Sequence, residues 1–237
     1  ALASLLVRVD LDWEGAGQQW EQISPGDRDG VDGYSMFLRL TGRFDEAVAT
    51  ARRALAAEPM APERILNLAT SLAWGRRYLE AEPVLEHLLE YYPTDHWGRY
   101  TLALCLERTG RHDEALAVFP EQPHSSQFLI LGDRARVEAE VAAMLQEVEE
   151  TGTTERAWHL SRHYAWLGDR DQALRWLKVA SEDHPKDFWI ANPTAEFDFL
   201  RSEPDFQACL RRVGFTEEMV AASTALADPT ILGDPAQ

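Results

Sequence analysis

The sequence predicts an all-α protein, a solenoid in which antiparallel helix hairpins stack in chain order. Three observations lead to this prediction. Apolar residues recur with the spacing of one helix face, glycines and prolines punctuate these segments, and the whole pattern repeats every 34 residues. The chain has 237 residues, 45% of them hydrophobic, which suffices for a large core in one elongated domain or two small ones.

The segment 41–59 has the features that one helix of such a hairpin needs. Gly42 is placed to end the preceding helix in a left-handed C-cap, and Pro59 stops the segment. Asp45 and Glu46 lie where the N-terminus of a helix favours negative charge. A neighbouring backbone can approach this helix closely, because its apolar face consists of the small residues Ala47, Ala51 and Ala54.

The same design recurs along the chain. An alanine early in the second helix of each hairpin occupies positions 47, 81 and 115, and later 139 and 173. Three hexapeptides are nearly identical: Gly42-Arg-Phe-Asp-Glu-Ala47, Gly110-Arg-His-Asp-Glu-Ala115 and Gly168-Asp-Arg-Asp-Gln-Ala173. On these residues the sequence resembles the tetratricopeptide repeat (TPR) family, whose unit is a pair of antiparallel helices. The resemblance implies a right-handed α-solenoid and a non-enzymatic protein-protein interaction module.

Departures from the period suggest where the array is interrupted. Only 24 residues separate Ala115 from Ala139, so we expect a break near 120–133 and a normal helix from about Arg134. After Pro185 the pattern gives way to large apolar residues, which suit a cap over the last repeat, with a short helix from about Pro204 to Val213.

These departures define the expected domain organisation. We expect a partial hairpin over 1–27, three units over 28–126, one truncated and one full unit over 127–187, an aromatic-rich capping segment over 188–216 and a tail over 217–237. The tail is expected to be partly disordered, or to add a helix over residues 217–227.

A second resemblance concerns the two ends of the chain. The opening segment 11–16 and the runs 199–206 and 210–215 resemble the C-terminal TPR region of bacterial multidomain regulators, in which the array follows a winged-helix, cyclase or Ser/Thr kinase domain. This resemblance implies the regulatory or sensory part of a larger signalling or transcription protein, and the missing initiator Met suggests a fragment. The alternative is a free-standing assembly scaffold or chaperone.

Composition argues against several functional classes. A net charge of −17 disfavours phosphate backbones and anionic membranes, so we expect neither nucleic-acid nor membrane binding and favour basic or amphipathic protein partners. No apolar run reaches the roughly 18–20 residues of a spanning helix. Cys105 and Cys209 suggest neither a disulfide framework nor a metal knuckle, which favours a reducing, cytoplasmic setting.

No catalytic residue and no cofactor is predicted, because phosphate-binding glycine loops and nucleophile elbows are both missing. Glu155, His159 and His163 share one helix face with i, i+4, i+8 spacing and are the candidate for a metal site. They lack a fourth ligand, and a polar helix edge beside a core stripe explains them as well. We therefore predict no metal site.

The TPR resemblance implies a partner groove lined by the first helix of each hairpin. An extended peptide or a partner helix would fit it. Its rows concentrate Trp, Tyr and Arg, the residue types that dominate binding energy when desolvated. The implied lining residues are Asp32, Met36, Arg39, Leu66, Thr70, Trp74, Trp97, Tyr100, Glu107, Arg108, Trp158, Arg162 and Trp166.

Alternatives to this groove remain open. Several aromatic residues could instead pack between adjacent hairpins, an alternative that is stronger for Trp158 and Trp166 than for Trp97 and Tyr100. A C-terminal carboxylate ligand is not expected, because the family's clamp uses Lys and Asn where this chain has Asp32, Met36, Leu66 and Thr70. An open end of the array could also pair with another copy, giving a homo-oligomer.

Overall fold

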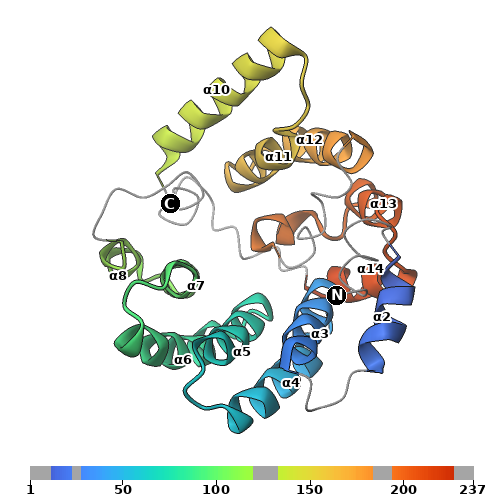
Figure 1. Cartoon of the computed structure of the whole chain (residues 1–237). Helices are drawn as coiled ribbons and strands as arrows, with labels where there is room; N and C mark the ends of the chain where they lie inside the picture. Colours follow the sequence, from blue (N-terminus) through green and yellow to red (C-terminus); the bar gives the residue numbers. More distant parts are fainter. Residues whose placement is uncertain (1–11, 23–27, 120–132, 184–193, 227–237) are drawn as a thin grey trace. The chain divides into compact units, whose positions relative to one another are not determined.

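The computed structural model describes residues 12–22, 28–119, 133–183 and 194–226, and every regular element among them is a helix (Figure 1). The prediction of an all-α protein is therefore confirmed. The chain divides into two compact units. The N-terminal unit comprises Gly17–Gly132, and the C-terminal unit comprises Asp133–Gln237 together with Ala1–Ala16. Helix α2 (Trp13–Glu21) contributes residues to both.

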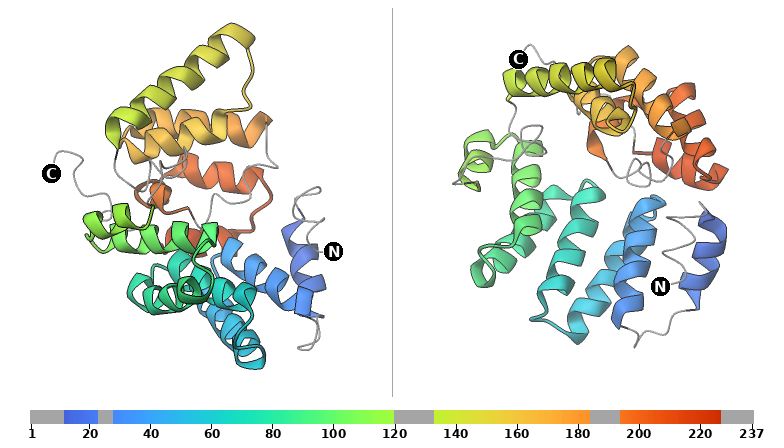
Figure 2. Two further views of the ribbon diagram at one scale, coloured as in Figure 1. Left: turned by 60° about the vertical axis from the view of Figure 1, so that its left-hand side comes forward. Right: turned by 45° about the horizontal axis from the view of Figure 1, so that its top comes forward.

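Three helix hairpins make up most of the N-terminal unit. Each helix packs against its neighbours in the chain, and α5 also contacts both α3 and α7, so that the first helices of the hairpins form one layer (Figure 2). The predicted packing of helices in adjacent pairs is confirmed. The helices are α3 (Arg28–Leu40), α4 (Phe44–Ala57), α5 (Pro62–Trp74), α6 (Tyr78–Tyr91), α7 (His96–Arg108) and α8 (His112–Ala117).

The 34-residue period is also present in the backbone conformation of the turns. Gly42, Arg76 and Gly110 are 34 residues apart and have left-handed φ angles of +81°, +63° and +78°. The N–H of the next residue then donates to the carbonyl oxygen five residues earlier, at 2.8, 2.9 and 2.9 Å. This is the hydrogen bond of a Schellman motif, which satisfies a carbonyl group at the end of each first helix.

In the second hairpin the left-handed residue of the turn is not glycine. The glycine of this turn lies one residue earlier in the chain. Gly75 has a φ of −79°, and Arg76 adopts the left-handed conformation instead. A Cβ atom on Gly75 would lie 3.1 Å from the Cβ of Phe44, so this glycine permits a close approach between α5 and α4. The expectation that glycine provides the left-handed residue thus holds at positions 42 and 110 but not here.

Small residues allow these helices to pack closely. Ala47, Ala51, Ala69 and Ala81 are completely buried, and larger groups such as Leu85 fill the space around them. Helix α8 is only six residues long, as the proline at position 120 predicts. One cluster of buried residues thus extends from α4 to α7, and a smaller one joins α7 to α8.

The C-terminal unit begins with a long helix at Arg134, as predicted. Its helices α11 and α12 form the tightest pair, α10 and the 3-10 helix η3 pack on α11, and α13 packs on both α12 and α14. Helix α13 ends one residue before the predicted boundary, and α14 occupies part of the tail. The elements are α10 (Arg134–Thr151), α11 (Ala157–Trp166), α12 (Arg170–Asp183), η3 (Ala195–Leu200), α13 (Pro204–Arg212) and α14 (Glu217–Thr224).

Aromatic residues fill the capping segment of this unit. Phe197 and Phe206 are fully buried with ring centroids 5.8 Å apart. Trp13 of α2 donates its indole N–H to the carbonyl oxygen of Val213 at 2.8 Å, and its ring packs edge-on against Phe215 at 4.5 Å. Phe199 of the same predicted segment is half-buried, and its Phe188 and Trp189 lie outside the described residues.

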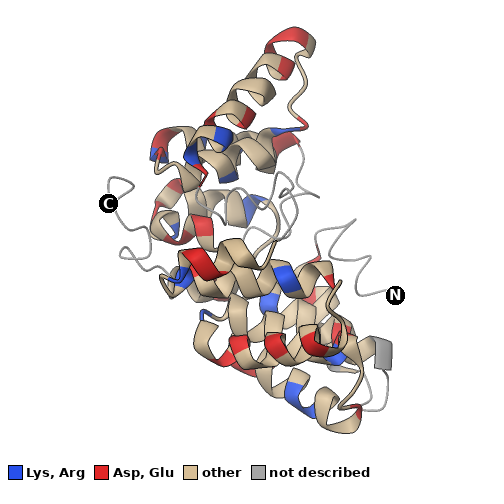
Figure 3. Cartoon of the chain, turned by 90° about the vertical axis from the view of Figure 1, so that its left-hand side faces the viewer, with Lys and Arg blue, Asp and Glu red and all other residues tan. Residues whose placement is uncertain are grey.

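Helix α10 is held by few buried residues. Only Val137 and Val141 are buried along its 18 residues. Acidic residues recur along the rest of the helix (Figure 3), namely Glu138, Glu140, Glu147, Glu149 and Glu150. Glu138, Glu149 and Glu150 are exposed, whereas Glu140 is half-buried and lies 2.8 Å from Nε2 of His163.

Candidate functional site

A polar network joins α3 to α5 in the layer of first helices. The side-chain amide of Asn67 donates to Asp32 Oδ1 at 2.7 Å, and Arg64 forms an ion pair with the other oxygen of Asp32. Arg39 donates from Nη1 to the carbonyl oxygen and the side chain of Asn67, and to Ser71 Oγ at 2.9 Å. The predicted site residues Asp32 and Arg39 therefore lie in a structural network that fixes the two helices together.

Arg39 is nearly inaccessible despite its charge. Its side chain is 4% exposed, and its guanidinium lies 5.2 Å from the centroid of the Trp74 ring. Burial lowers the pKa of Arg39 to about 10, while the nearby carboxylate of Asp32 opposes that shift. The guanidinium remains cationic at neutral pH, and its hydrogen bonds and the Trp74 ring compensate for lost water. The Arg39 guanidinium therefore contacts the Trp74 ring and is too buried to contact a ligand directly.

Helix α7 presents the most accessible aromatic residue of the predicted row. Trp97 is 63% exposed, and its ring packs edge-to-face on Tyr100 with centroids 5.8 Å apart. The ring centroid of His96 lies 6.3 Å from that of Trp97. Tyr100 is partly buried against the core of the last hairpin. The Trp97 ring is therefore held at its base while most of its surface remains open.

The remaining predicted residues of the N-terminal unit are half-buried. The Thr70 hydroxyl donates to the carbonyl oxygen of Leu66 within α5, at 2.7 Å. Met36 receives a 3.5 Å contact from Arg39, and Glu107 lies 2.9 Å from His112. Arg108 is half-buried at the end of α7. These side chains add polar and apolar contacts to the first-helix layer without forming a catalytic arrangement.

Three predicted residues belong to α11 in the C-terminal unit. Trp158 is buried, with its ring centroid 5.5 Å from that of Phe197, so it contributes to packing inside this unit. Arg162 donates to Glu196 at 2.5 Å and thereby ties α11 to η3. Trp166 is half-buried at the C-terminal end of the helix. Trp158 therefore follows the packing alternative that the sequence left open.

The metal-site candidate does not form a cluster. His163 is buried, with Nδ1 2.7 Å from the carbonyl oxygen of His159 and Nε2 2.8 Å from Glu140 on α10. Glu155 precedes α11 and is exposed. No group of three His, Cys, Asp or Glu side chains within the described ranges could hold a metal ion. In the structure His163 joins α11 to α10.

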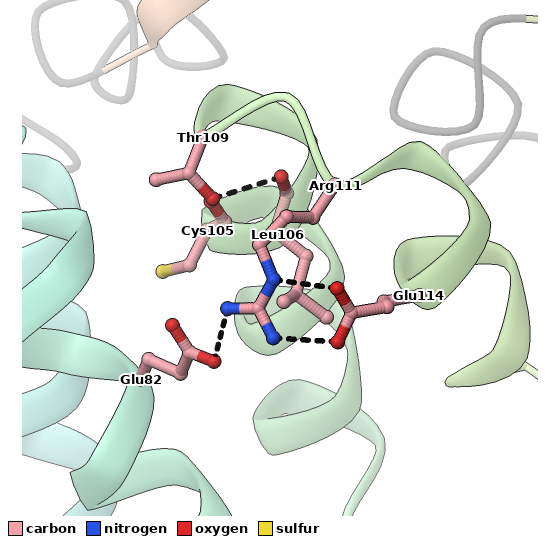
Figure 4. A network of polar contacts seen from close by, with 6 residues as sticks. All are labelled: Glu82, Cys105, Leu106, Thr109, Arg111 and Glu114. Atoms are coloured by element: carbon pink, nitrogen blue, oxygen red, sulfur yellow. Dashed lines mark hydrogen bonds and ion pairs between the residues drawn. The ribbon is translucent and has the colours of Figure 1, made fainter.

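Sequence reasoning missed a series of ion pairs that follows the repeat. Arg43, Arg77 and Arg111 are 34 residues apart, and each contacts the glutamate three residues later at its own helix start. Arg111 also reaches back to Glu82 of α6, which links the second and third hairpins (Figure 4). The 34-residue recurrence of Arg followed by Glu was the available signal.

Comparison with known proteins agrees with this geometry. Residues 33–53 and 75–127 each match a family model described as tetratricopeptide repeat. The chain contains tetratricopeptide repeats. The first segment covers most of α3 and of α4, and the second begins after α5 and includes α6, α7 and α8, so the TPR match falls on the hairpins of the N-terminal unit.

A second comparison is with a named relative. Over 107 residues the chain is 35% identical to the cytochrome c-type biogenesis protein CycH of Rhizobium meliloti (strain 1021). The match covers 44% of this chain and 28% of the relative's length. None of the described helices has the length and apolar character needed to cross a membrane.

Proposed function

We propose that this TPR chain is a non-enzymatic assembly scaffold or chaperone that binds a peptide or a helix of another protein on the first helices of its N-terminal unit. The observation that carries this proposal is the Trp97 ring, which is 63% exposed yet anchored on Tyr100. A large aromatic ring with fixed orientation loses little conformational entropy on binding, and Trp and Tyr are enriched in binding hot spots.

The two comparisons support an assembly role better than a regulatory one. TPR arrays generally bind proteins or peptides, and the relative is named for its part in the biogenesis of c-type cytochromes. The regulatory hypothesis rests on the resemblance of the chain ends to multidomain regulators. An assembly partner with basic or amphipathic character suits the acidic chain, whose net charge is −17.

A binding measurement with a matched control tests the site. Peptides selected against the wild-type chain from a displayed random library should lose at least about tenfold in affinity for the Trp97→Ala/Tyr100→Ala variant, about 1.4 kcal/mol. Leu79→Ala is the control, because Leu79 is a 72% exposed apolar residue on α6, a second helix. Unchanged affinity in the double variant, with helicity retained, would reject this site.

The named relative also suggests one candidate partner. If the chain takes part in c-type cytochrome biogenesis, the haem-free polypeptide of a c-type cytochrome should bind the wild-type chain and the Leu79→Ala control but not the Trp97/Tyr100 variant. Binding of selected peptides without binding of that polypeptide would retain the scaffold and reject this partner.

A further inference from the structure

A groove runs between α12 and α13 of the C-terminal unit, on residues separate from the site proposed above. It has a volume of about 390 Å³. Helix α12 lines it with Asp171, Leu174, Arg175 and Lys178. Helix α13 lines it with Asp205, Ala208, Cys209 and Arg212. Both sets follow i, i+3, i+4, i+7 spacing, so each helix contributes one continuous face.

Helices α12 and α13 run parallel, so that residues of like charge lie side by side at each end of the groove. Arg170 at the start of α12 pairs with Glu203, the residue before α13. At the other end, Arg212 lies 3.2 Å from both Glu182 and Ser181 near the end of α12. One end of the groove is consequently acidic, from Asp171 and Asp205, and the other end is basic, from Lys178 and Arg212.

The charged side chains at both ends of the groove can form ion pairs with a ligand. Within the described residues Asp171, Asp205 and Lys178 form no ion pair, whereas Arg212 is shared with Glu182. Between these ends lie the apolar side chains of Leu174 and Ala208 and the exposed guanidinium of Arg175. Exposed charges of opposite sign at fixed positions set the orientation of a partner more than its affinity.

The spacing matches two turns of a helix. Seven residues separate the acidic from the basic position on α12, or roughly 10 Å at 1.5 Å per residue. A helix favours acidic residues in its first turn and basic residues in its last. When it lies antiparallel to α12 and α13, its first turn meets Lys178 and Arg212 and its last turn meets Asp171 and Asp205.

We propose that the groove between α12 and α13 binds an amphipathic helix of a partner protein in this antiparallel orientation. The contacting face of that helix has an acidic residue at position i, small apolar residues at i+3 and i+4, and a basic residue at i+7. The groove recognises the helix by charge order along its length.

Two synthetic helical peptides test the proposal directly. One carries Glu, Ala, Leu and Lys at positions i, i+3, i+4 and i+7, and the other exchanges the Glu and Lys. In fluorescence anisotropy with the full chain at low salt, the first peptide should bind about tenfold more tightly than the second. Equal affinity, or binding of neither peptide, overturns the proposal.

A charge exchange in the groove supplies a second test. Asp171→Lys/Lys178→Asp keeps the net charge, alters exposed side chains only, and should abolish the preference between the two peptides. Arg134→Glu/Glu138→Arg is the control, because it exchanges an exposed ion pair on α10 and should retain the preference. Retained preference in the groove variant, or its loss in the control, would contradict the assignment.

A third measurement uses the unmodified protein and depends on no variant. Lys178 is one of only two lysines in the chain, so acylation of its amine is simple to follow by mass spectrometry. The first peptide should slow acylation of Lys178 several-fold, and the exchanged peptide should not. An unprotected Lys178 would reject binding in the groove while leaving the Trp97 site unaffected.

Discussion

Arg201 donates a 2.6 Å hydrogen bond from Nε to Oδ1 of Asp198, and both side chains are completely buried. The same guanidinium donates to Ser223 Oγ at 2.8 Å and to the carbonyl oxygen of Thr194 at 3.0 Å. One cation thus connects η3 and α14 with the residue that precedes η3. Desolvation of two charges is costly, so the pair depends on these hydrogen bonds.

Arg201→Met should destabilise the C-terminal unit strongly. The substitution leaves the carboxylate of Asp198 buried without its cation, which typically costs about 3–5 kcal/mol. Urea unfolding followed by circular dichroism measures the loss, and the Asp198→Asn/Arg201→Met double variant should lose less than the two single variants combined.

Arg211→Met is the matched control for Arg201→Met. Arg211 also donates to a carboxylate at 2.6 Å, that of Glu217, but both side chains are exposed. Exposed pairs contribute little because water and salt screen them, so the unfolding midpoint should hardly move. Equal destabilisation by both variants would show that burial of the Arg201 pair does not increase its contribution to the free energy of unfolding.

The hairpins could be predicted because their signals are local and repeated. Glycine at positions 42 and 110, small residues on the helix faces and a constant 34-residue period each act within one unit. The capping contacts could not be predicted in the same way. Trp13 and Val213 are 200 residues apart, and no local pattern indicates that an indole N–H will meet that carbonyl group.

The candidate site was less accessible to prediction than the fold. Periodicity places a residue on a helix face, but it does not show how neighbouring side chains share the space. Arg39 and Trp97 fall in the same predicted row, yet one is 4% and the other 63% exposed. The difference arises from Asn67 and Ser71 of α5, which surround the Arg39 guanidinium.

Gly33→Ala should destabilise the N-terminal unit through a steric clash. A Cβ atom at this position would lie 2.1 Å from Cη2 of Trp20, whose ring is 5% exposed and packs across α2 and α3. Forcing atoms into a packed site costs about 1–3 kcal/mol, despite the better helix propensity of Ala. Thermal unfolding measures the loss, and a smaller residue at position 20 should reduce it.

Gly110→Ala separates backbone strain from this clash. A Cβ atom there would meet no atom within 4 Å, but the φ of +78° is unfavourable for a side chain and costs about 1 kcal/mol. Removing bulk at Trp20 should not rescue this variant. Rescue of both glycine variants by the same change at position 20 would contradict the proposed distinction.

Both thiols should resist modification in the folded protein. Burial raises the pKa of Cys105 to about 12, with a smaller contribution from the charge of Glu82, and burial also raises the pKa of Cys209. The thiolate is the reactive species, so labelling with a disulfide reagent at pH 8 should be slow until urea exposes both residues. Rapid labelling of the folded chain would show that these sites open readily.

Acid should weaken the hairpins through the repeated ion pairs. Hydrogen bonds from Arg43, Arg77 and Arg111 lower the pKa values of the glutamates three residues later below their ordinary 4.5. A carboxyl group with a lowered folded-state pKa contributes stability above pH 4.5 that is lost as the pH falls through its folded pKa. A Glu46→Gln/Glu80→Gln/Glu114→Gln variant should therefore unfold at lower temperature than wild type at pH 7, and the difference should shrink as the pH is lowered below 4.5. A difference in melting temperature that stays constant from pH 7 to acid would exclude these carboxylates as its source.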